Sequence, residues 1–195
     1  MKPNRETEIK LPVENPRSMQ RKLIQAGFKR VKPRQFERNL LFDFPDRRLY
    51  KSRCLLRLRF TNGDSLLTFK GPPRLSKWYK VRDESETSIE AGEQLRAILE
   101  SIGLKVFYRY EKYRTTFAPC SRSKFGGSAT VVFDETPVGN FLELEGPELW
   151  ILTTARRLGF DTKDFITSSY ASLHRQLWKM RGREPEDMIF RKRKS

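Results

Sequence analysis

Charged or polar side chains recur at every second position in six separate segments of this chain, and no other feature of the sequence limits the fold as strongly. In the first segment, Glu6, Glu8 and Lys10 alternate with Thr7 and Ile9. Successive side chains of a β-strand point to opposite faces, so these three charges share one face of an extended segment. The other five segments place these residues on one face: Arg57 and Arg59; Thr68 and Lys70; Lys80, Arg82, Glu84 and Glu86; Tyr108, Tyr110, Lys112 and Arg114; and Glu143 and Glu145. The alternation predicts strands with one apolar and one charged face.

Strands dominate the predicted secondary structure, and a few helices separate them. Alternation predicts eight strands, over residues 5–11, 36–43, 53–60, 65–70, 78–86, 106–117, 129–134 and 139–145. Start and stop signals predict four helices: 16–26, a helix that follows a capping box at Ser88-Ile89-Glu90-Ala91 and ends at Gly103, 147–159, and 163–180. The last of these carries Ile166, Tyr170, Leu173 and Leu177 on one stripe. The combination predicts an α+β fold.

The charged faces of the strands have two physical explanations. An antiparallel sheet with its apolar face on the core and its charged face in water would explain any single strand. Six matched strands favour a different arrangement for two reasons. Few uncharged polar residues occur among the charges. Acids also gather on the first and last strands, while bases occupy most of the strands between. The helices have apolar stripes that must pack against the apolar strand faces. If they cover the outside of the sheet, the charged faces line an interior.

A charged interior is costly unless its members pair with one another or hold a ligand. Glu6, Glu8, Glu143 and Glu145 supply the hard oxygen ligands that Mg²⁺ or Mn²⁺ prefers. The lysines and arginines of the other strands can neutralise a chain of phosphates. The residues therefore predict a site for a divalent metal and a triphosphate-bearing small molecule.

The overall charge agrees with an anionic partner. The chain has 40 Lys and Arg against 24 Asp and Glu, a formal net charge of +16, which favours phosphates or nucleic acid. A basic solvated surface with a basic tail explains the charge alone equally well. The one histidine, His174, excludes a histidine-rich metal site, and Cys54 and Cys120 lack metal-ligand spacing.

The sequence also bears on where the protein resides. No apolar run approaches the about 20 residues that a membrane span needs. The first residues are charged and lack the apolar stretch of a secretory signal. We therefore expect no membrane contact and a cytoplasmic location. The oligomeric state stays open, a homodimer included.

Several of these segments resemble one known family. The segment Glu6-Thr7-Glu8-Ile9-Lys10 matches the ExExK signature of the CYTH superfamily, the triphosphate tunnel metalloenzymes, which takes its name from a bacterial class IV adenylyl cyclase and a thiamine triphosphatase. The similarity continues through Leu56-Arg57-Leu58-Arg59, Thr68-Phe69-Lys70-Gly71-Pro72, Arg82-Asp83-Glu84-Ser85-Glu86, Glu111-Lys112-Tyr113-Arg114, Asp134-Glu135-Thr136-Pro137, Gly139-Asn140-Phe141-Leu142-Glu143-Leu144-Glu145-Gly146 and Ser169-Tyr170. Together these blocks cover residues 6–172, nearly the whole chain.

The resemblance implies an eight-stranded antiparallel β-barrel that forms a tunnel, with helices packed outside. It also implies that Mg²⁺ or Mn²⁺ is held by Glu6, Glu8, Glu143 and Glu145, with Asp134 nearby. The bases that it implies for gripping the triphosphate are Lys10, Arg57, Arg59, Lys70, Lys112 and Arg114, and Arg82 belongs to a shared block. Asp134 also begins a segment that contains Pro137, and a role in that turn explains it equally well.

The residues leave the chemistry open among three functions. We favour a metal-dependent phosphohydrolase acting on tripolyphosphate or on a nucleoside or thiamine triphosphate, because the motifs grip phosphates. The alternatives are a class IV adenylyl cyclase, which converts ATP to cyclic AMP and pyrophosphate, and a non-catalytic polyphosphate- or nucleic-acid-binding module. Nucleic acid is disfavoured, since four aligned carboxylates would repel a phosphate backbone unless they held metal. We expect the tunnel domain to span residues 1–180 and residues 181–195 to form a basic, mobile tail.

Overall fold

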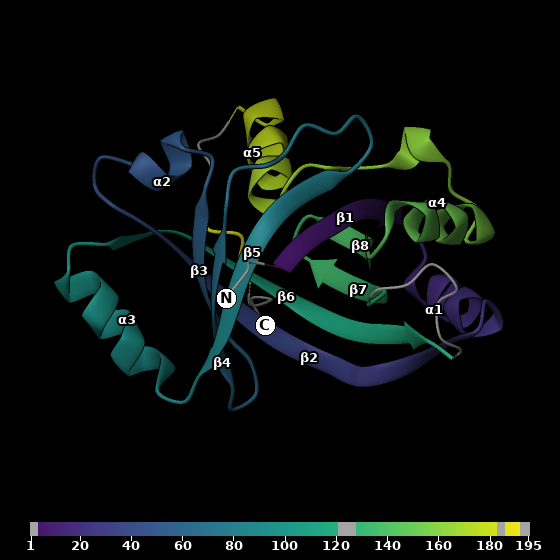
Figure 1. Ribbon diagram of the computed structural model, residues 1–195, viewed down its shortest axis with the longest axis horizontal. Coiled ribbons are helices and arrows are strands. Elements are labelled where there is room, and N and C mark those ends of the chain that lie inside the picture. The colour runs from purple at the N-terminus through teal and green to yellow at the C-terminus, as the bar shows by residue number, and fades with distance from the viewer. Residues whose placement is uncertain (1–3, 121–127, 183–185, 192–195) are drawn as a thin grey trace.

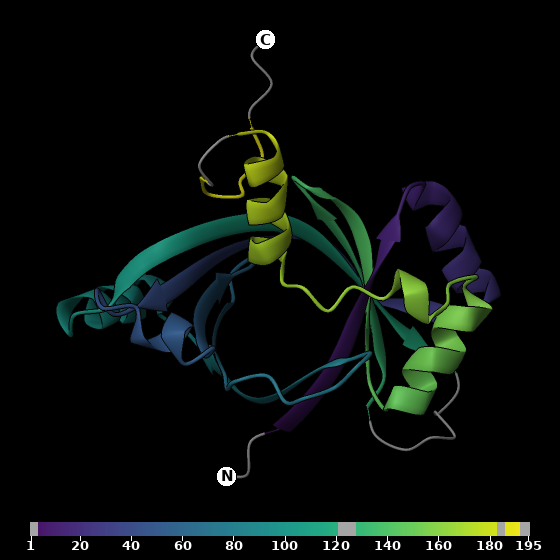
Figure 2. The same cartoon turned by 90° about the horizontal axis from the view of Figure 1, so that it is seen from above.

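Eight antiparallel strands close into a barrel in the computed structural model, which describes residues 4–120, 128–182 and 186–191. Their order around the ring is β1-β5-β4-β3-β2-β6-β7-β8, and Figures 1 and 2 show the ring from two directions. The strands are β1 (Asn4–Val13), β2 (Phe28–Asp43), β3 (Leu55–Phe60), β4 (Ser65–Lys70), β5 (Lys80–Ile89), β6 (Lys105–Pro119), β7 (Thr130–Thr136) and β8 (Gly139–Glu145). The predicted α+β fold with a closed barrel is confirmed.

The helices lie outside the ring of strands. They are α1 (Pro16–Gln25), α2 (Arg48–Lys51), α3 (Gly92–Ser101), α4 (Glu148–Arg157) and α5 (Tyr170–Met180), with a 3-10 turn, η1, at Thr162–Asp164. Figure 2 shows α3 at one end of the molecule, α1 and α4 at the other, and α5 over the rim of the barrel. Within the described residues, no helix is long and apolar enough to cross a membrane.

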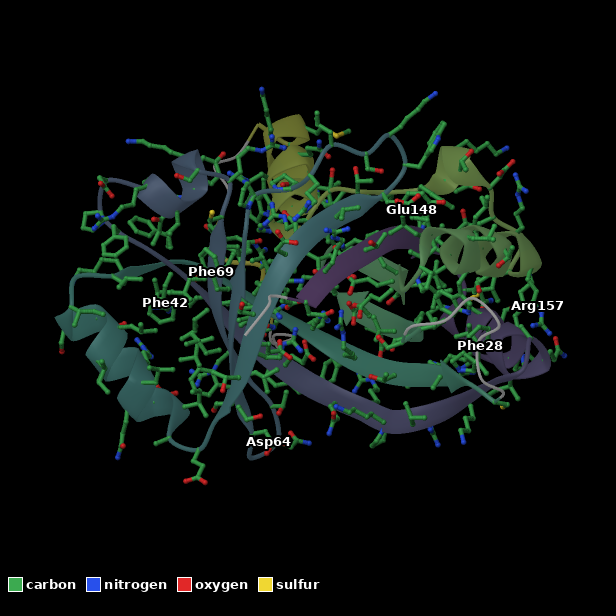
Figure 3. The ribbon with its side chains drawn as sticks, in the orientation of Figure 1. Phe28, Phe42, Asp64, Phe69, Glu148 and Arg157 are labelled. Carbon is green, nitrogen blue, oxygen red and sulfur yellow. The ribbon has the colours of Figure 1, made fainter. Side chains whose placement is uncertain are left out.

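The larger apolar core lies between the outer face of the barrel and helices α1 and α4. Ile9 of β1, Phe133 of β7 and Leu144 of β8 are fully buried there, together with Leu23 of α1. Trp150 of α4 packs edge-on against Phe28 of β2, which Figure 3 labels at this end of the molecule. Apolar burial stabilises the fold by about 25 cal/mol per Å². These strands are therefore held with their apolar faces outward.

A second, smaller apolar core fixes the opposite wall of the barrel. Leu58 of β3 and Leu40 and Phe42 of β2 pack there with Leu99 of α3. Figure 3 shows Phe42 on the α3 side of the strands. Phe69 of β4 also points outward and is 41% exposed. Outward apolar side chains on β2, β3 and β4 leave the alternate, charged positions facing inward.

The register of the strands sets the inner face. Glu8 of β1 lies opposite Lys80 of β5 on one side and opposite Glu145 of β8 on the other. Arg57 of β3 lies opposite Thr68 of β4. Because a shift of one residue would turn every inner side chain outward, this pairing fixes both the core and the charged interior.

The structure corrects several boundaries predicted from the sequence. The strand predicted over 36–43 begins at Phe28, and the four-residue helix α2 was not predicted. The capping box at Ser88 is wrong, because Ser88 belongs to β5 and α3 begins at Gly92 without a side-chain cap. The helix predicted over 163–180 begins only at Tyr170, since Ile166 forms two backbone hydrogen bonds with Lys10 and extends alongside β1.

Residues 186–191, which lie in the segment predicted to be a basic, mobile tail, contact β6. The Met188 N–H donates to the Arg109 carbonyl and the Glu111 N–H donates to the Met188 carbonyl, both at 2.9 Å. Met188 is fully buried. Since β7 pairs only with the later part of β6, the earlier edge of β6 is open to this short pairing. The rest of the predicted tail, 183–185 and 192–195, lies outside the described residues.

Two single substitutions test which strand face is packed. Leu144→Ala removes a fully buried side chain and should lower the free energy of unfolding by about 2–5 kcal/mol. Phe69→Ala, at a partly exposed position on β4, should lower it by less than about 1 kcal/mol. Chemical denaturation of both variants and the wild type makes the comparison. Equal losses would contradict the packing described.

Candidate functional site

The strands enclose a cavity of about 880 Å³ with a mostly charged lining. This volume is in the upper part of the range of about 300–1,000 Å³ that small-molecule sites occupy. Among the residues predicted for the site, these line the cavity: Glu6, Glu8, Lys10, Arg57, Arg59, Lys70, Arg82, Lys112, Arg114, Glu143 and Glu145. Lys80, Glu84 and Glu86 of β5 line it as well, and Tyr170 at the start of α5 closes part of one side. The alternating residues of six strands therefore meet in one space.

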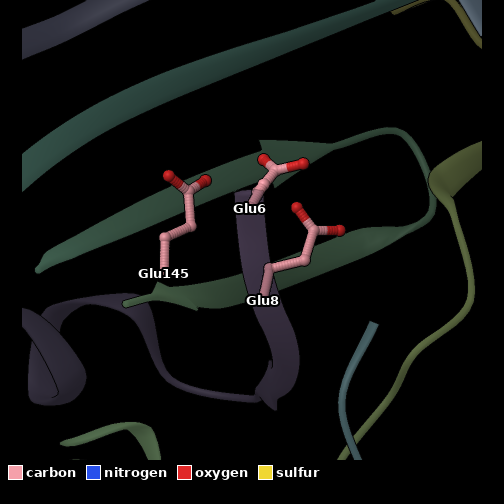
Figure 4. Close-up of side chains that lie close together, drawn as sticks. All are labelled: Glu6, Glu8 and Glu145. Carbon is pink, nitrogen blue, oxygen red and sulfur yellow. The ribbon is translucent and has the colours of Figure 1, made fainter. Parts of the chain in front are cut away.

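Three carboxylates gather on the wall formed by β1 and β8. Oxygen atoms of Glu6, Glu8 and Glu145 all lie within 4.8 Å of one another, and Figure 4 shows their carboxylates turned to the same space. Glu8 and Glu145 are direct cross-strand neighbours, and Glu6 is two residues before Glu8 on the same face. Like charges in such positions destabilise a sheet. Three hard oxygen donors in this arrangement fit a divalent cation such as Mg²⁺.

Burial and mutual repulsion raise the pKa values of two of these carboxylates. Burial, with Glu8 as the next cause, raises the pKa of Glu6 to about 7 against the opposing effect of Lys70. Burial also raises the pKa of Glu145, and Glu143 adds to this effect while Arg114 opposes it. A divalent cation would favour the ionised form of both groups.

Lys10 connects the first and the last strand of the site. Its Nζ lies 3.0 Å from Glu8 Oε1 and 3.0 Å from Glu143 Oε1. Lys80 Nζ approaches the same Glu8 oxygen at 2.5 Å. Burial opposes the charged form of these groups, but the pairing outweighs it and lowers the pKa values of Glu8 and Glu143 well below their usual range. Glu8 and Glu143 are therefore both ionised and engaged by bases. Glu143 lies outside the three-carboxylate cluster, whose oxygens are grouped by distance.

Asp134 on β7 is fully buried among bases. Its carboxylate accepts hydrogen bonds from Lys112 Nζ at 2.9 Å, Arg114 Nε at 2.7 Å and the Tyr170 hydroxyl at 2.9 Å. Arg114, opposite Asp134 in the register, also donates to Glu143. The structure thus places Asp134 where it orients two cavity-lining bases, and not with the three gathered carboxylates. Asp134 also lies within β7, before the turn that the sequence analysis gave as an alternative explanation for this residue.

Glu37 and Asn39 on β2 belong to the same network, and the sequence did not single them out. Glu37 Oε2 lies 3.5 Å from Arg59 Nε and 3.5 Å from Lys112 Nζ, and Asn39 Oδ1 lies 3.4 Å from Arg59 Nε. Burial alone would raise the pKa of Glu37, but Lys112, Arg114 and Arg59 outweigh it and lower that pKa to about 2. The outward residue between them, Arg38, is charged too, so the alternation that marks the other strands is hidden here.

Two arginines retain unused donors inside the barrel. Arg57 contacts the Tyr110 hydroxyl at 3.4 Å and Thr68 Oγ1 at 3.1 Å. Among the described residues, the buried Nε atoms of Arg57 and Arg82 have no hydrogen-bond partner. Unpaired buried donors are costly, and both arginines line the cavity. An anionic ligand with several oxygen atoms would satisfy them.

His174 on α5 supports the wall of the cavity from behind Tyr108. Its Nδ1 lies 2.9 Å from the Tyr108 hydroxyl, and the Trp178 indole donates to its Nε2. A nitrogen that accepts carries no proton, so the proton of neutral His174 is on Nδ1 and is donated to Tyr108. Burial lowers the pKa of His174, in agreement with a neutral ring. The Tyr108 hydroxyl keeps its own proton for another acceptor.

Protonation of Glu6 gives a pH-dependent stability that a single variant can test. The pKa of Glu6 is raised from 4.5 to about 7 in the fold, so without metal the folded state holds its proton longer than the unfolded state. The resulting loss of stability begins above pH 4.5 and is complete above pH 7. Glu6→Gln should therefore stabilise the metal-free protein by about 1–3 kcal/mol at pH 8 and have little effect at pH 4.5.

Chemical denaturation in EDTA at the two pH values measures this difference. Glu14→Gln, on the exposed segment after β1, is the matched control and should change stability equally little at both. A Glu6→Gln effect that is the same at both pH values would contradict the raised pKa.

Known proteins share these features of sequence and fold. The family model of the CYTH domain matches residues 4–170. A protein of Methanocaldococcus jannaschii named "Putative adenylate cyclase MJ0240" is 31% identical over 140 residues, 72% of this chain and 75% of that protein. A "putative adenylate cyclase" of Vibrio parahaemolyticus has a similar structure, with a TM-score of 0.72 and 21% identity over 86% of this chain and 96% of that one.

A second structural neighbour comes from Hippeastrum. It is named "Putative adenylyl cyclase HpAC1" and described as having a dominant triphosphatase activity. Its TM-score is 0.59, with 19% identity over 91% of this chain and 96% of that one. At these identities the two structures establish a common fold. The match of the family model over residues 4–170 shows that this chain belongs to the CYTH domain family.

Proposed function

We propose that this protein is a metal-dependent phosphohydrolase that binds a triphosphate inside its barrel. The observation that carries the proposal is one cavity in which three carboxylates, Glu6, Glu8 and Glu145, face bases from several other strands. Carboxylates in such a cluster suit a hard cation, and lysine and arginine suit phosphate oxygens. The two halves of the cavity wall thus complement the two parts of a metal–triphosphate complex.

In this proposal the charges of the strands require a metal. The site holds eight bases: Lys10, Arg57, Arg59, Lys70, Lys80, Arg82, Lys112 and Arg114. It also holds eight acids: Glu6, Glu8, Glu37, Glu84, Glu86, Asp134, Glu143 and Glu145. Because these charges balance when all of the acids are ionised, a triphosphate brings an excess of negative charge that the barrel alone does not neutralise. A divalent cation on Glu6, Glu8 and Glu145 would neutralise phosphate oxygens and stabilise charge that develops during the reaction.

The bases of the barrel bind and orient the phosphates in this proposal. Arg57 and Arg82 supply unused donors, and Arg114 is held in place by Asp134. Water attacks the terminal phosphorus in line with the bridging oxygen, whose bond to that phosphorus breaks. Orthophosphate and the shortened phosphate chain leave. Fixed cations favour this step because they need no reorganisation as charge shifts to the leaving oxygen.

Cyclisation of ATP is the second candidate, because the curated relative at 31% identity carries the name of an adenylate cyclase. In that reaction the ribose 3′-oxygen attacks the α-phosphorus and pyrophosphate leaves. Hydrolysis is preferred because the described contacts of the site explain phosphate binding, and the Hippeastrum neighbour is described as mainly a triphosphatase. A cytoplasmic location stays a prediction of the sequence.

Analysis of reaction products separates the candidates. Purified protein with Mg²⁺ or Mn²⁺ should release orthophosphate from tripolyphosphate and from ATP or thiamine triphosphate, and EDTA should stop the release. Chromatography with phosphate detection makes the measurement. Cyclic AMP with pyrophosphate as the main products from ATP would instead establish the cyclase. Binding of triphosphates without turnover would indicate that the protein is a non-catalytic binding module.

Removal of one carboxylate tests the metal cluster. Glu145→Gln keeps the shape of the side chain but loses the charge that a divalent cation requires, so hydrolysis should fall at least about 100-fold while the protein stays folded. Glu14→Gln serves again as the exposed control. Normal turnover of Glu145→Gln at saturating Mg²⁺ would remove this residue from the site.

Loss of an arginine tests the phosphate grip. Arg57→Ala should weaken binding of tripolyphosphate by roughly ten- to a hundredfold, because a charged hydrogen bond contributes about 1.5–3 kcal/mol. Binding of orthophosphate should weaken much less, since a short anion does not need every base. Calorimetry with both anions in Mg²⁺ compares the two losses. Equal losses would indicate a general electrostatic field and no positioned clamp.

A further inference from the structure

The mouth of the cavity beside α2 and α5 differs in charge from the interior. Arg47, Lys51 and Arg53 from the segment around α2, and Arg175 from α5, line this part of the cavity. We refer to these four residues as the outer arginine cluster. In the part of the chain that the structure describes, Asp43 is the acid that lines the cavity beside them. The strand-borne charges balance, so the excess of positive charge in the cavity lies at its mouth.

Asp43 does little to neutralise this excess. One of its carboxylate oxygens accepts the backbone N–H of Leu49 at 3.0 Å, and the other accepts that of Tyr50 at 3.0 Å. The carboxylate also lies 3.5 Å from Arg47 Nε. Within residues 4–120, 128–182 and 186–191, no ion pair is found for the other three members of the cluster. Asp43 therefore serves mainly to fix the loop that presents them.

Two members of the cluster share one aromatic ring. The guanidinium of Arg47 lies 5.1 Å from the ring centre of Tyr50, and that of Arg175 lies 5.4 Å from the same centre. Arg175 Nη1 also donates to the Tyr50 hydroxyl at 3.3 Å. The two guanidinium groups repel each other, because both lie within 5.4 Å of one ring centre and their separation cannot much exceed the screening length of about 10 Å in ordinary salt. An anion between them would remove the repulsion.

The backbone that carries the cluster is strained at two points. Arg47 has φ = 60° and Arg53 has φ = 58°, and they flank α2 on either side. Residues with a Cβ enter this left-handed region at a cost in free energy, and such strain concentrates at binding sites. The hydrogen bonds to Asp43 hold the segment in place against this cost. The strain aims two arginines at the cavity from opposite ends of one short helix.

We propose that the outer arginine cluster binds a further phosphate of the substrate, beyond the triphosphate held inside the barrel. The inference rests on the proposed triphosphate site, whose bases are matched by its own acids and leave no excess for another phosphate. One continuous cavity of about 880 Å³ includes both regions, so a single ligand can reach both. The preferred substrate is then a triphosphate extended by at least one phosphate. An inorganic polyphosphate chain and a 5′-triphosphorylated nucleotide chain share this chemistry.

Two pairs of substrates test the proposal and distinguish its two sources. The first pair is tripolyphosphate and tetrapolyphosphate, and the second is ATP and the 5′-triphosphorylated dinucleotide pppApA. In one of the pairs, kcat/KM of the wild type should be about tenfold higher for the extended member, because one more charged contact forms. Arg175→Ala and Arg53→Ala should lose this advantage while kcat/KM for the short member changes less than about twofold. Arg175→Lys should keep most of it.

Arg156→Ala is the matched control, since Arg156 is exposed on α4 and does not line the cavity. Equal use of short and extended members by the wild type in both pairs would overturn the proposal. Losses of the same size for both members in the alanine variants would overturn it as well. If the wild type hydrolyses none of the four, the proposed function fails, and calorimetry with Mg²⁺ compares their binding. Tighter binding of an extended member that depends on Arg175 would then support the cluster, and equal binding would overturn it.

Discussion

Pairing of buried acids with buried bases across neighbouring strands is the interaction on which the rest of this structure depends. Lys10 lies between Glu8 and Glu143, and Arg114 lies between Asp134 and Glu143, all of them largely or fully buried. Each charge alone would cost several kcal/mol to bury, and loss of one partner leaves that cost with the other. The network is therefore tolerated only at the register that brings these residues together. The apolar cores outside the barrel require the same register. The strand register therefore determines both the fold and the arrangement of the site.

This pairing also defines where a ligand belongs. Most interior charges, Glu6 and Glu8 included, already have a partner of opposite sign. Inside the barrel, two places still call for a ligand. Glu6, Glu8 and Glu145 concentrate negative charge on one wall, while Arg57 and Arg82 keep unpaired donors. A metal–triphosphate complex supplies what both places lack. The outer arginine cluster is a third place with uncompensated charge, and it differs because a loop and a helix carry it instead of the strands.

The strands and the inward side of their charges could be predicted from the sequence because alternation with period two reports the faces of a strand directly. Arg57 and Lys70 faced inward as predicted, with Leu58 and Phe69 outside. The sequence did not predict features that depend on packing between distant segments and not on the local pattern of residues. Glu37 is hidden because its outward neighbour Arg38 is also charged. Nothing in the sequence around Asp134 indicates that its carboxylate accepts hydrogen bonds from Arg114 and Tyr170. The pairing of Met188 with β6 depends on an open strand edge that only the assembled barrel reveals.

The central claim is that metal and triphosphate are bound together, because the eight bases of the interior are matched by eight acids when all of these are ionised. Titration calorimetry of the wild-type protein with tripolyphosphate, once in saturating Mg²⁺ and once in EDTA, tests this most directly. The account predicts that tripolyphosphate binds at least about tenfold more tightly in Mg²⁺, a difference of at least about 1.4 kcal/mol. An equal or higher affinity in EDTA would contradict it, and would mean that the bases of the barrel bind the triphosphate without help from the three carboxylates.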